Sequence, residues 1–198
     1  MREVDTRSMA LSLPSARRKV VLAPAPGLMH KRECVQCEHP GCSRITCITA
    51  QFCSRHLPLH TGLRVGPSTL PGAGLGLFAA RDFRRETPIG YFTGALVPAS
   101  IVHAPTYRSC YALELNEEWV IDCNSTQDSI LRYSNDCFPA QKKRGLCRVN
   151  AGFFEGDPGL RLWAIRDIAT GEEIFWHYGK SYWEVDCLTG EPTCAKCH

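Results

Sequence analysis

The sequence predicts a mainly β domain built from short strands and flanked by small zinc-binding segments. The 198 residues are 44% apolar, which is enough to bury a core. The apolar runs are short and separated by Gly and Pro turns, which is typical of strands. Of the twelve cysteines, five lie between residues 34 and 53 and three between residues 187 and 197. This clustering near both ends predicts metal-binding segments around a central domain.

Two features argue against export and against a membrane span. Glu3 and Asp5 lie where a secretory signal carries positive charge, and no apolar run approaches the roughly 18–20 residues that cross a bilayer. Without an export signal, clustered cysteines favour zinc over disulfides. The net charge of +3 is too small to indicate a partner.

Composition divides the chain into four parts. Residues 1–30 are rich in Ser, Pro, Ala and Arg and lack periodicity, so we expect a disordered tail there. Residues 31–62 contain the first cysteine cluster, residues 63–183 form the main domain, and residues 184–198 form a cysteine-containing tail.

The first cluster has the spacing of a small zinc knuckle. Cys37 and Cys42 form a first pair, and Cys53 with His56 forms a second pair in a Cys-Ser-x-His run. Zinc takes four nitrogen or sulfur ligands in a tetrahedron, and a short segment needs the metal because it has little core. We therefore expect zinc on these four residues. Cys34 with Cys37 is the alternative first pair, and reduced cysteines packed in a small core are the alternative to a metal.

The main domain reads as a succession of short elements. A short helix is expected at 126–133, and the turn at 168–174 leads into a last, aromatic-rich strand. The other strands are expected at 63–65, 89–97, 111–115, 119–122, 148–154 and 160–165.

Two glycine-containing runs resemble nucleotide-binding motifs, but each lacks a feature that its motif needs. The run from Pro71 to Gly76 lets backbone approach a ligand closely, but a long helix does not follow it, so it is not a dinucleotide fingerprint. Gly179-Lys180-Ser181 resembles the end of a phosphate-binding loop, but Ile174 stands where that loop needs glycine. Neither run predicts nucleotide binding.

Two further runs bring polar groups to the ends of apolar segments. Arg132 to Cys137 is a small polar cluster, and Tyr178 precedes Gly179 at the end of the aromatic-rich run. Such groups are what a small-molecule site needs.

These runs, in this order, resemble the SET domain, the fold of protein-lysine methyltransferases that use S-adenosylmethionine. Gly74 to Ala79 is similar to its Gly-x-Gly-x-Phe-Ala motif, and residues 132–137 are similar to its Arg-Phe-x-Asn-His-Ser-Cys motif. Residues 166–179 match its closing motif, Gly-Glu-Glu-Ile-x-x-x-Tyr-Gly included, and the resemblance covers roughly residues 63–183. It implies a β-clip fold of short curved sheets with a C-terminal pseudoknot.

The resemblance also implies roles for individual residues. Tyr178 would be the catalytic tyrosine, and Tyr111 and Trp176 would line the channel that receives the lysine. Asn135 would bind the amino group of the cofactor. The full set expected around the cofactor is Gly74, Leu75, Gly76, Arg132, Tyr133, Asn135, Asp136, Tyr178 and Trp183.

The cysteine tail resembles the zinc segment that follows many SET domains. By that resemblance Cys187, Cys194 and Cys197 would bind a second zinc together with Cys137. Their spacing departs from the family pattern, so Cys147 or His198 could substitute, and loose tail cysteines are the alternative.

The chemistry agrees with lysine methylation. Methyl transfer from a sulfonium is an in-line displacement, so positioning is the main task. The attacking amine must be neutral although a free lysine has a pKa of about 10.4, and a dry aromatic channel favours the neutral form. We expect a nuclear enzyme acting on a histone tail, with Glu114, Glu117, Glu118 and Asp122 as candidates for an acidic groove.

Two departures from the family motifs motivate a rival reading. Asp136 replaces the usual histidine, and the loop from Phe138 to Arg148 is longer than usual. A SET-fold binding module that has lost activity is therefore the alternative function. A second alternative makes residues 34–60 a nucleic-acid or protein-docking module. The sequence leaves direct nucleic-acid binding and a cytoplasmic location open.

Overall fold

The computed structural model describes residues 19–22, 34–46, 51–102, 104, 107, 109–124, 129–137, 145, 147–156 and 159–179. These residues form a mainly β structure of short sheets, which confirms the predicted fold class. Trp183 and the tail cysteines Cys187, Cys194 and Cys197 lie outside the described residues.

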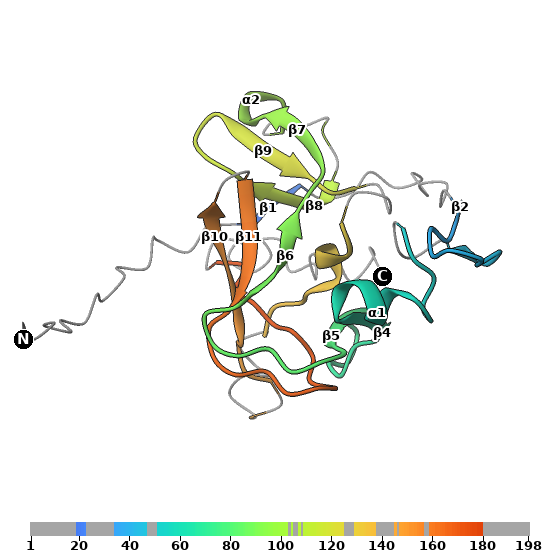
Figure 1. The fold of residues 1–198 in the computed structure, drawn as a ribbon. Coiled ribbons are helices and arrows are strands. Elements are labelled where there is room, and N and C mark those ends of the chain that lie inside the picture. Colours follow the sequence, from blue (N-terminus) through green and yellow to red (C-terminus); the bar gives the residue numbers. More distant parts are fainter. Residues whose placement is uncertain are drawn as a thin grey trace, which may run out of the picture.

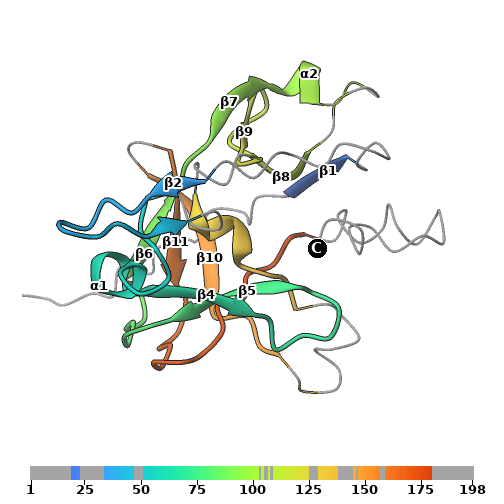
Figure 2. The ribbon, with the colours of Figure 1, turned by 90° about the vertical axis from the view of Figure 1, so that its right-hand side faces the viewer.

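Two sheets form the body of the molecule (Figures 1 and 2). One has the order β10-β11-β6, with β10 at Ala151–Gly156, β11 at Gly159–Ala164 and β6 at Pro88–Phe92. The other has the order β1-β8-β9-β7, with β1 at Lys19–Leu22, β8 at Ser109–Glu114, β9 at Trp119–Asp122 and β7 at Ala95–Pro98. The strands predicted at 111–115 and 119–122 form the antiparallel pair β8–β9, and those predicted at 148–154 and 160–165 form the antiparallel pair β10–β11.

Two strand pairs and three short helical turns complete the fold. β4 (Leu63–Pro67) pairs with β5 (Leu75–Ala79), and β2 (Val35–Gln36) pairs with β3 (Ile45–Thr46). The helical elements are α1 (Leu57–Thr61), α2 (Ala99–Val102) and the 3₁₀ turn η1 (Ile130–Tyr133). Gly62 ends α1 in the left-handed conformation, at φ 71°, where glycine carries no steric penalty.

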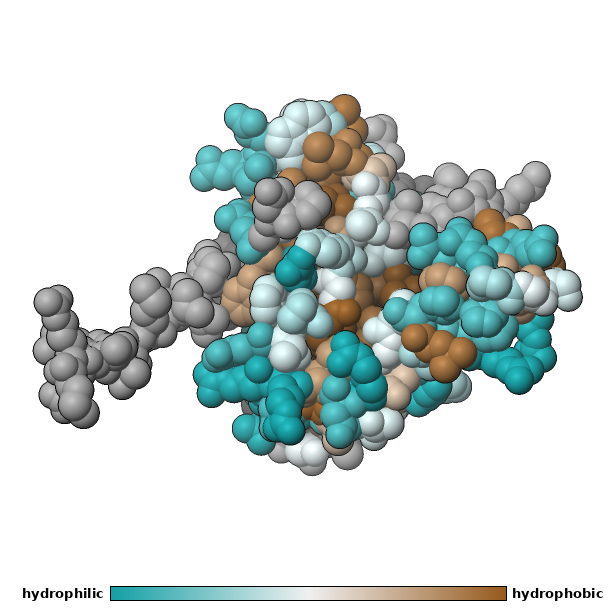
Figure 3. Space-filling model, viewed as in Figure 1, coloured by the Kyte–Doolittle hydropathy of each residue, from teal (hydrophilic) through white to brown (hydrophobic). Residues whose placement is uncertain are grey.

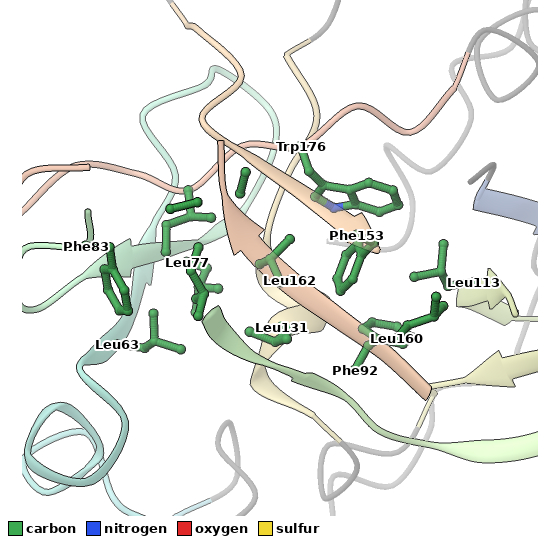
Figure 4. Packing of buried hydrophobic residues seen from close by; sticks show 14 of the residues in the cluster. Leu63, Leu77, Phe83, Phe92, Leu113, Leu131, Phe153, Leu160, Leu162 and Trp176 are labelled. Carbon is green, nitrogen blue, oxygen red and sulfur yellow. The ribbon is translucent and has the colours of Figure 1, made fainter. Parts of the chain in front are cut away.

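The main core lies between the three-stranded sheet, β5 and η1 (Figure 4). β11 alternates strictly: Leu160, Leu162 and Ala164 are buried while the residues between them are partly exposed. This period of two presents one face of the strand to the core. Leu77 of β5 and Leu131 of η1 meet that face, so the glycine-rich run and the polar cluster are both anchored next to it.

The predicted single strand at 89–97 is wrong, because the chain forms two strands that belong to different sheets. β6 ends at Phe92 and β7 begins at Ala95. At Gly94 a Cβ atom would lie 2.3 Å from the carbonyl oxygen of Asp122 in β9. The chain therefore bends at a position where only glycine allows the backbones to approach.

Two other predicted elements differ from the structure. Residues 172–179 form no regular strand; they make single bridges, Glu173 to Phe78 and Phe175 to Asn135. The predicted helix at 126–133 is a 3₁₀ turn over its last four residues, capped by the Ser129 side chain, which accepts from the Leu131 N–H. Residues 125–128 lie outside the described part.

The N-terminal region contains one element that the sequence did not suggest. β1 pairs antiparallel with β8, with Val20 opposite Ala112, inside the stretch that composition predicts to be an unstructured tail. β1 thereby covers the free edge of β8.

Apolar surface is visible over α2 and β7 in Figure 3. Leu96 and Ile101 are the large exposed apolar side chains of these two elements. Among the described residues, none of the helices has the length and apolar character that crossing a membrane requires.

Candidate active site and metal centre

The polar cluster at residues 132–137 and the aromatic-rich run at residues 172–179 cross each other in the structure. Asn135 bridges Phe175 in parallel, and the Trp176 N–H donates to the Asn135 carbonyl at 3.0 Å. The segment from Glu173 to Tyr178 thus passes between β5 on one side and residues 134–136 on the other. This crossing brings together two runs about forty residues apart.

The carbonyl oxygen of Ser134 accepts two side-chain hydrogen bonds from the aromatic-rich run. It accepts the Tyr178 hydroxyl at 2.8 Å and the Trp176 indole N–H at 3.0 Å. Ser134, Trp176 and Tyr178 are all buried. Two aromatic side chains of the closing run are therefore fixed on a single backbone atom next to Asn135.

Trp176 and Tyr178 also form an aromatic wall. Their ring centroids are 4.7 Å apart at 49°, and Phe153 packs edge-on against Trp176 at 4.8 Å. Trp176 belongs to the main core (Figure 4), which leaves little freedom for either ring.

Glu173 is a buried carboxylate around which the site is built. Its oxygens accept from the Ser68 hydroxyl at 2.7 Å, the Thr69 N–H at 2.7 Å and the Thr69 hydroxyl at 2.5 Å. The Asn135 amide nitrogen donates to it at 3.2 Å. A buried charge needs such donors, and together they connect the loop before β5 to the crossing.

Gly76 is required by that carboxylate. A Cβ atom at Gly76 would lie 2.2 Å from Oε1 of Glu173 and 3.2 Å from the Ser68 backbone. The sequence suggested that the glycines admit a ligand. At Gly76 the space is taken by Glu173 instead, while Gly74 supplies a positive φ of 68° for the turn into β5.

Asn135 ties the glycine-rich turn to the crossing. Its Nδ2 donates to the Leu75 carbonyl at 3.0 Å, in addition to Glu173 and to the Ser68 hydroxyl at 3.3 Å. Each hydrogen bond described for this side chain uses the amide nitrogen. The structure therefore brings together Gly74, Leu75, Gly76, Asn135 and Tyr178, which the resemblance assigned to one site.

Tyr111 and Arg132 form a stacked pair beside the crossing. The Arg132 guanidinium lies 3.7 Å from the centroid of the Tyr111 ring, and its Nη1 donates to the Asn124 carbonyl at 2.9 Å. Tyr111 of β8 is half-buried against the main core, and so is Tyr133. The stack adds a fixed positive charge to the aromatic surroundings of the site.

Asp122 does not belong to an acidic groove, which corrects the prediction made for it. It is buried and accepts hydrogen bonds from the hydroxyls of Tyr107 and Ser109. Burial, and then the hydrogen bond to Asp122, raises the pKa of Tyr107. Glu117 and Glu118 are exposed and Glu114 is half-buried.

A second cluster lies in the segment before β4. The ligand atoms of Cys37, Cys42, Cys53 and His56 lie within 4.8 Å of one another. His56 Nδ1 is 3.5 Å from the Cys37 sulfur and 3.6 Å from the Cys53 sulfur. Sulfur and nitrogen ligands of one tetrahedral zinc lie about 3.5 Å apart, from bond lengths of about 2.3 and 2.0–2.1 Å. The four side chains could therefore hold a metal ion.

Cys34, the alternative ligand of that cluster, is not among these four residues. His60 makes a 2.9 Å contact through Nε2 with Nδ1 of His39, whose ring stacks on His56 at 3.8 Å.

Cys137, expected to bind the tail zinc, is buried with Cys147, Leu70 and Phe175. Its three expected partners lie outside the described residues.

Comparison with known proteins agrees with this geometry. The family model described as "SET domain" matches residues 74–179. The chain belongs to the SET-domain family. The matched residues run from the glycine-rich turn through the crossing, so this SET domain contains every interaction of the candidate active site except those of Ser68 and Thr69.

Individual relatives of this SET domain are distant. Histone-lysine N-methyltransferase trr of Drosophila melanogaster is 28% identical over 62% of this chain and 5% of its own length. N-lysine methyltransferase KMT5A-A of Danio rerio is 27% identical over 56% of this chain and 33% of its own length. A humanized mutant of the Chaetomium thermophilum Polycomb Repressive Complex 2 has 26% identity over 59% of this chain and 15% of its own, with a TM-score of 0.49. The chain thus spans a minor part of each relative.

Sequence reasoning missed Glu173, Ser68 and Thr69. Glu173 was noted as part of the closing motif, and nothing local indicated that its carboxylate would be buried. The one available signal is the Glu172-Glu173 pair before an apolar residue, since one of two adjacent carboxylates entering a core must find donors.

Proposed function

We propose that this protein is an S-adenosylmethionine-dependent protein-lysine N-methyltransferase. The observation that carries the proposal is the set of contacts that joins three motifs: Tyr178 to the Ser134 carbonyl, and Asn135 to the Leu75 carbonyl. A sulfonium-dependent transfer needs a cofactor-binding turn and an orienting hydroxyl held in fixed relation, and these contacts support that arrangement.

The residues present fit the cofactor. The backbone of Gly74 to Gly76 and the side chain of Asn135 would hold its methionine end, and the main chain of Asp136 would face its adenine. Because the described hydrogen bonds of Asn135 use Nδ2, its Oδ1 is available as an acceptor for an ammonium group. When bound, S-adenosylmethionine supplies an electrophilic methyl group on sulfur.

Tyr178 would orient the reacting groups without changing charge. Its hydroxyl donates to the Ser134 carbonyl, and a phenolic oxygen can also accept the N–H of an incoming amine. Trp176, fixed on the same carbonyl, would form one wall of the lysine channel, with Tyr111 as another. The contribution of these residues is position and exclusion of water.

Arg132 would favour the reactive form of the substrate. Its guanidinium lies against the Tyr111 ring, so an amine that enters between the aromatic side chains meets a positive charge. A neighbouring like charge and a dry surrounding both disfavour the ammonium form of lysine. The amine would then lose its proton to water before attack. Its lone pair would form the N–C bond while the bond from sulfur to the methyl carbon breaks, and S-adenosylhomocysteine would leave.

We infer a histone tail as the substrate and the nucleus as the location. Two relatives are named as lysine methyltransferases, one of them a histone-lysine methyltransferase. The exposed Glu117 and Glu118 lie in the turn between β8 and β9 and give this region negative charge suited to a basic peptide.

We also infer that Cys37, Cys42, Cys53 and His56 bind one Zn²⁺. The spacing of their ligand atoms fits a tetrahedral ion, and the Cys53 N–H donates to the Cys37 sulfur at 3.2 Å, which stabilises a thiolate ligand. The metal would stabilise a segment whose two strands have only two residues each.

Incubation of the protein with mixed core histones and methyl-labelled S-adenosylmethionine tests the proposal. We expect label on histone lysine, located by mass spectrometry. Histone peptides that bind without becoming labelled would instead support the SET-fold binding module. A partner that binds residues 34–60 while turnover is independent of that segment would support the docking module.

A further inference from the structure

We propose that Asp136 is a positioning residue for Tyr178 and that its carboxylate replaces a backbone carbonyl in the crossing. The proposal deepens the function proposed above and rests on it. Asp136 stands where the family motif has histidine, and that departure was the reason to consider an inactive module. The geometry points to a defined role for the carboxylate instead.

The first observation is the contact of Asp136 with the backbone of Tyr178. Oδ2 of Asp136 accepts the Tyr178 N–H at 3.0 Å, and the Asp136 side chain is 3% exposed. A buried carboxylate that accepts a backbone N–H makes a charge-assisted hydrogen bond, which is stronger than a neutral one. Two nearby residues therefore hold Tyr178. The Asp136 side chain holds its backbone N–H, and the Ser134 carbonyl, two residues earlier, accepts its phenolic hydroxyl.

The second observation is where the parallel pairing stops. The Trp176 N–H donates to the Asn135 carbonyl, as a parallel ladder requires. In a continued ladder the next bond, from the Tyr178 N–H, would go to the carbonyl of Cys137, because bonds repeat every second residue. The Asp136 carboxylate takes that N–H. The ladder therefore ends at Asn135, and Tyr178 leaves it at a point fixed by the length of the Asp136 side chain.

The third observation is that the next residues are held in the same manner. The Gly179 N–H donates to Nδ1 of His177 at 2.9 Å, and the same nitrogen lies 3.6 Å from Oδ2 of Asp136. Residues 176–179 belong to no strand in the described part of the chain. The N–H groups of Tyr178 and Gly179 thus donate to the side chains of Asp136 and His177 instead of to backbone carbonyls.

The consequence is a link from Asp136 to the hydroxyl of Tyr178. The phenol reaches the Ser134 carbonyl only if its backbone is held at the right distance from Asn135. Loss of the acceptor at position 136 would release the Tyr178 backbone while leaving the contacts of Asn135 with Leu75 and Glu173 intact. Turnover would then fall without a matching loss of cofactor affinity.

Two substitutions test this inference. In Asp136→Ala the acceptor is lost, and we expect kcat to fall about 10- to 100-fold, the equivalent of one charge-assisted hydrogen bond. The dissociation constant of S-adenosylmethionine should change less than about threefold. Asp136→Asn keeps an acceptor oxygen at the same distance and should restore most of the lost turnover. Asp167→Ala is the matched control, since Asp167 also accepts a backbone N–H, from Arg85 at 2.7 Å, but on the exposed surface.

Amide hydrogen exchange of the peptide that contains Tyr178 separates this inference from the proposed function. We expect faster exchange at Tyr178 in Asp136→Ala, and wild-type exchange in Asp136→Asn and in Asp167→Ala. If the wild type transfers no methyl group but this exchange pattern holds, the positioning role stands and the proposed enzyme activity fails. Unchanged exchange at Tyr178 in Asp136→Ala, or kcat and cofactor affinity falling together, would overturn the positioning role.

Discussion

The candidate metal-binding segment at residues 34–62 and the crossing of residues 131–137 with 172–179 hold their side chains together in opposite ways. The first brings four soft ligands to one point within a short stretch of chain, with two strands of two residues each. The second surrounds a buried carboxylate, Glu173, with donors from two distant segments, Ser68 with Thr69 and Asn135. The comparison teaches that the first, if it binds zinc as proposed, depends on a bound ion, whereas the second depends on a completed fold.

Removal of the metal should have the largest effect, and only on the first region. Binding of a structural zinc contributes on the order of 10 kcal/mol to the folding of such a segment. We expect Cys53→Ser to lower the zinc count by one in native mass spectrometry and to speed amide exchange throughout residues 34–62. Cys123→Ser, at a buried cysteine outside the ligand set, should keep the full count. An unchanged zinc count in Cys53→Ser would contradict the proposed ligand set.

Filling the space at Gly76 should have the next largest effect, and it should fall on the crossing. A methyl group there would lie 2.2 Å from the Glu173 carboxylate, so either the loop or the carboxylate must move. We expect Gly76→Ala to cost about 3 kcal/mol of unfolding free energy and to abolish cofactor binding. Gly90→Ala is the control, because its Cβ would meet only Leu131 methyl groups at 3.5 Å. Equal melting temperatures for the two variants would contradict this account.

A negative charge at position 135, in the same crossing, should lower the unfolding free energy by less than the Gly76 substitution does. Asn135→Asp preserves the shape of the side chain but replaces the donor that faces Glu173 at 3.2 Å with a second carboxylate. We expect a loss of about 1–3 kcal/mol, larger than that of Asn135→Ala, because like charges repel where a hydrogen bond stood. Chemical denaturation of the two variants measures the difference. A more stable Asn135→Asp would mean that Glu173 is not the charged centre of the site.

The smallest predicted effect concerns Glu172, next to the buried carboxylate. Burial would raise its pKa, but hydrogen bonds from Arg166 and Asn150 outweigh burial and lower it below its ordinary value of 4.5. A lowered folded-state pKa stabilises the fold above that value, and the stabilisation is lost as the pH falls through the folded-state pKa. Glu172→Gln should therefore flatten the fall of stability below pH 4.5, and exposed Glu118→Gln should not. Parallel acid-unfolding curves for wild type and Glu172→Gln would contradict this.

The same comparison explains what the sequence could predict. The four candidate metal ligands lie within twenty residues, so their spacing indicated this set, with Cys34 left open as the alternative to Cys42. Asn135 and Tyr178 were identified by motif, because their residue types recur at fixed intervals. The strand order inside each hairpin was also predictable, since the partners are neighbours in the sequence.

Contacts between distant segments were not predictable in this way. Thr69 and Glu173 are 104 residues apart, and neither has a local pattern that names the other. The break between β6 and β7 depends on the backbone of Asp122 in a strand that comes later. The run at 172–179 has the composition of a strand but lies between two different partners, so it makes only single bridges. In each case tertiary contacts override local preference.

The central claim is that the crossing holds Tyr178 over a cofactor site that Asn135 and the glycine-rich turn form without it. Tyr178→Phe, studied by calorimetric titration of S-adenosylmethionine and by methyl transfer to histones, tests this most directly. We predict that the variant binds the cofactor with an affinity within about threefold of wild type, since only the hydroxyl contact to Ser134 is lost, and that transfer is abolished. Undiminished transfer by Tyr178→Phe, or no binding heat with the wild-type protein, would contradict the account.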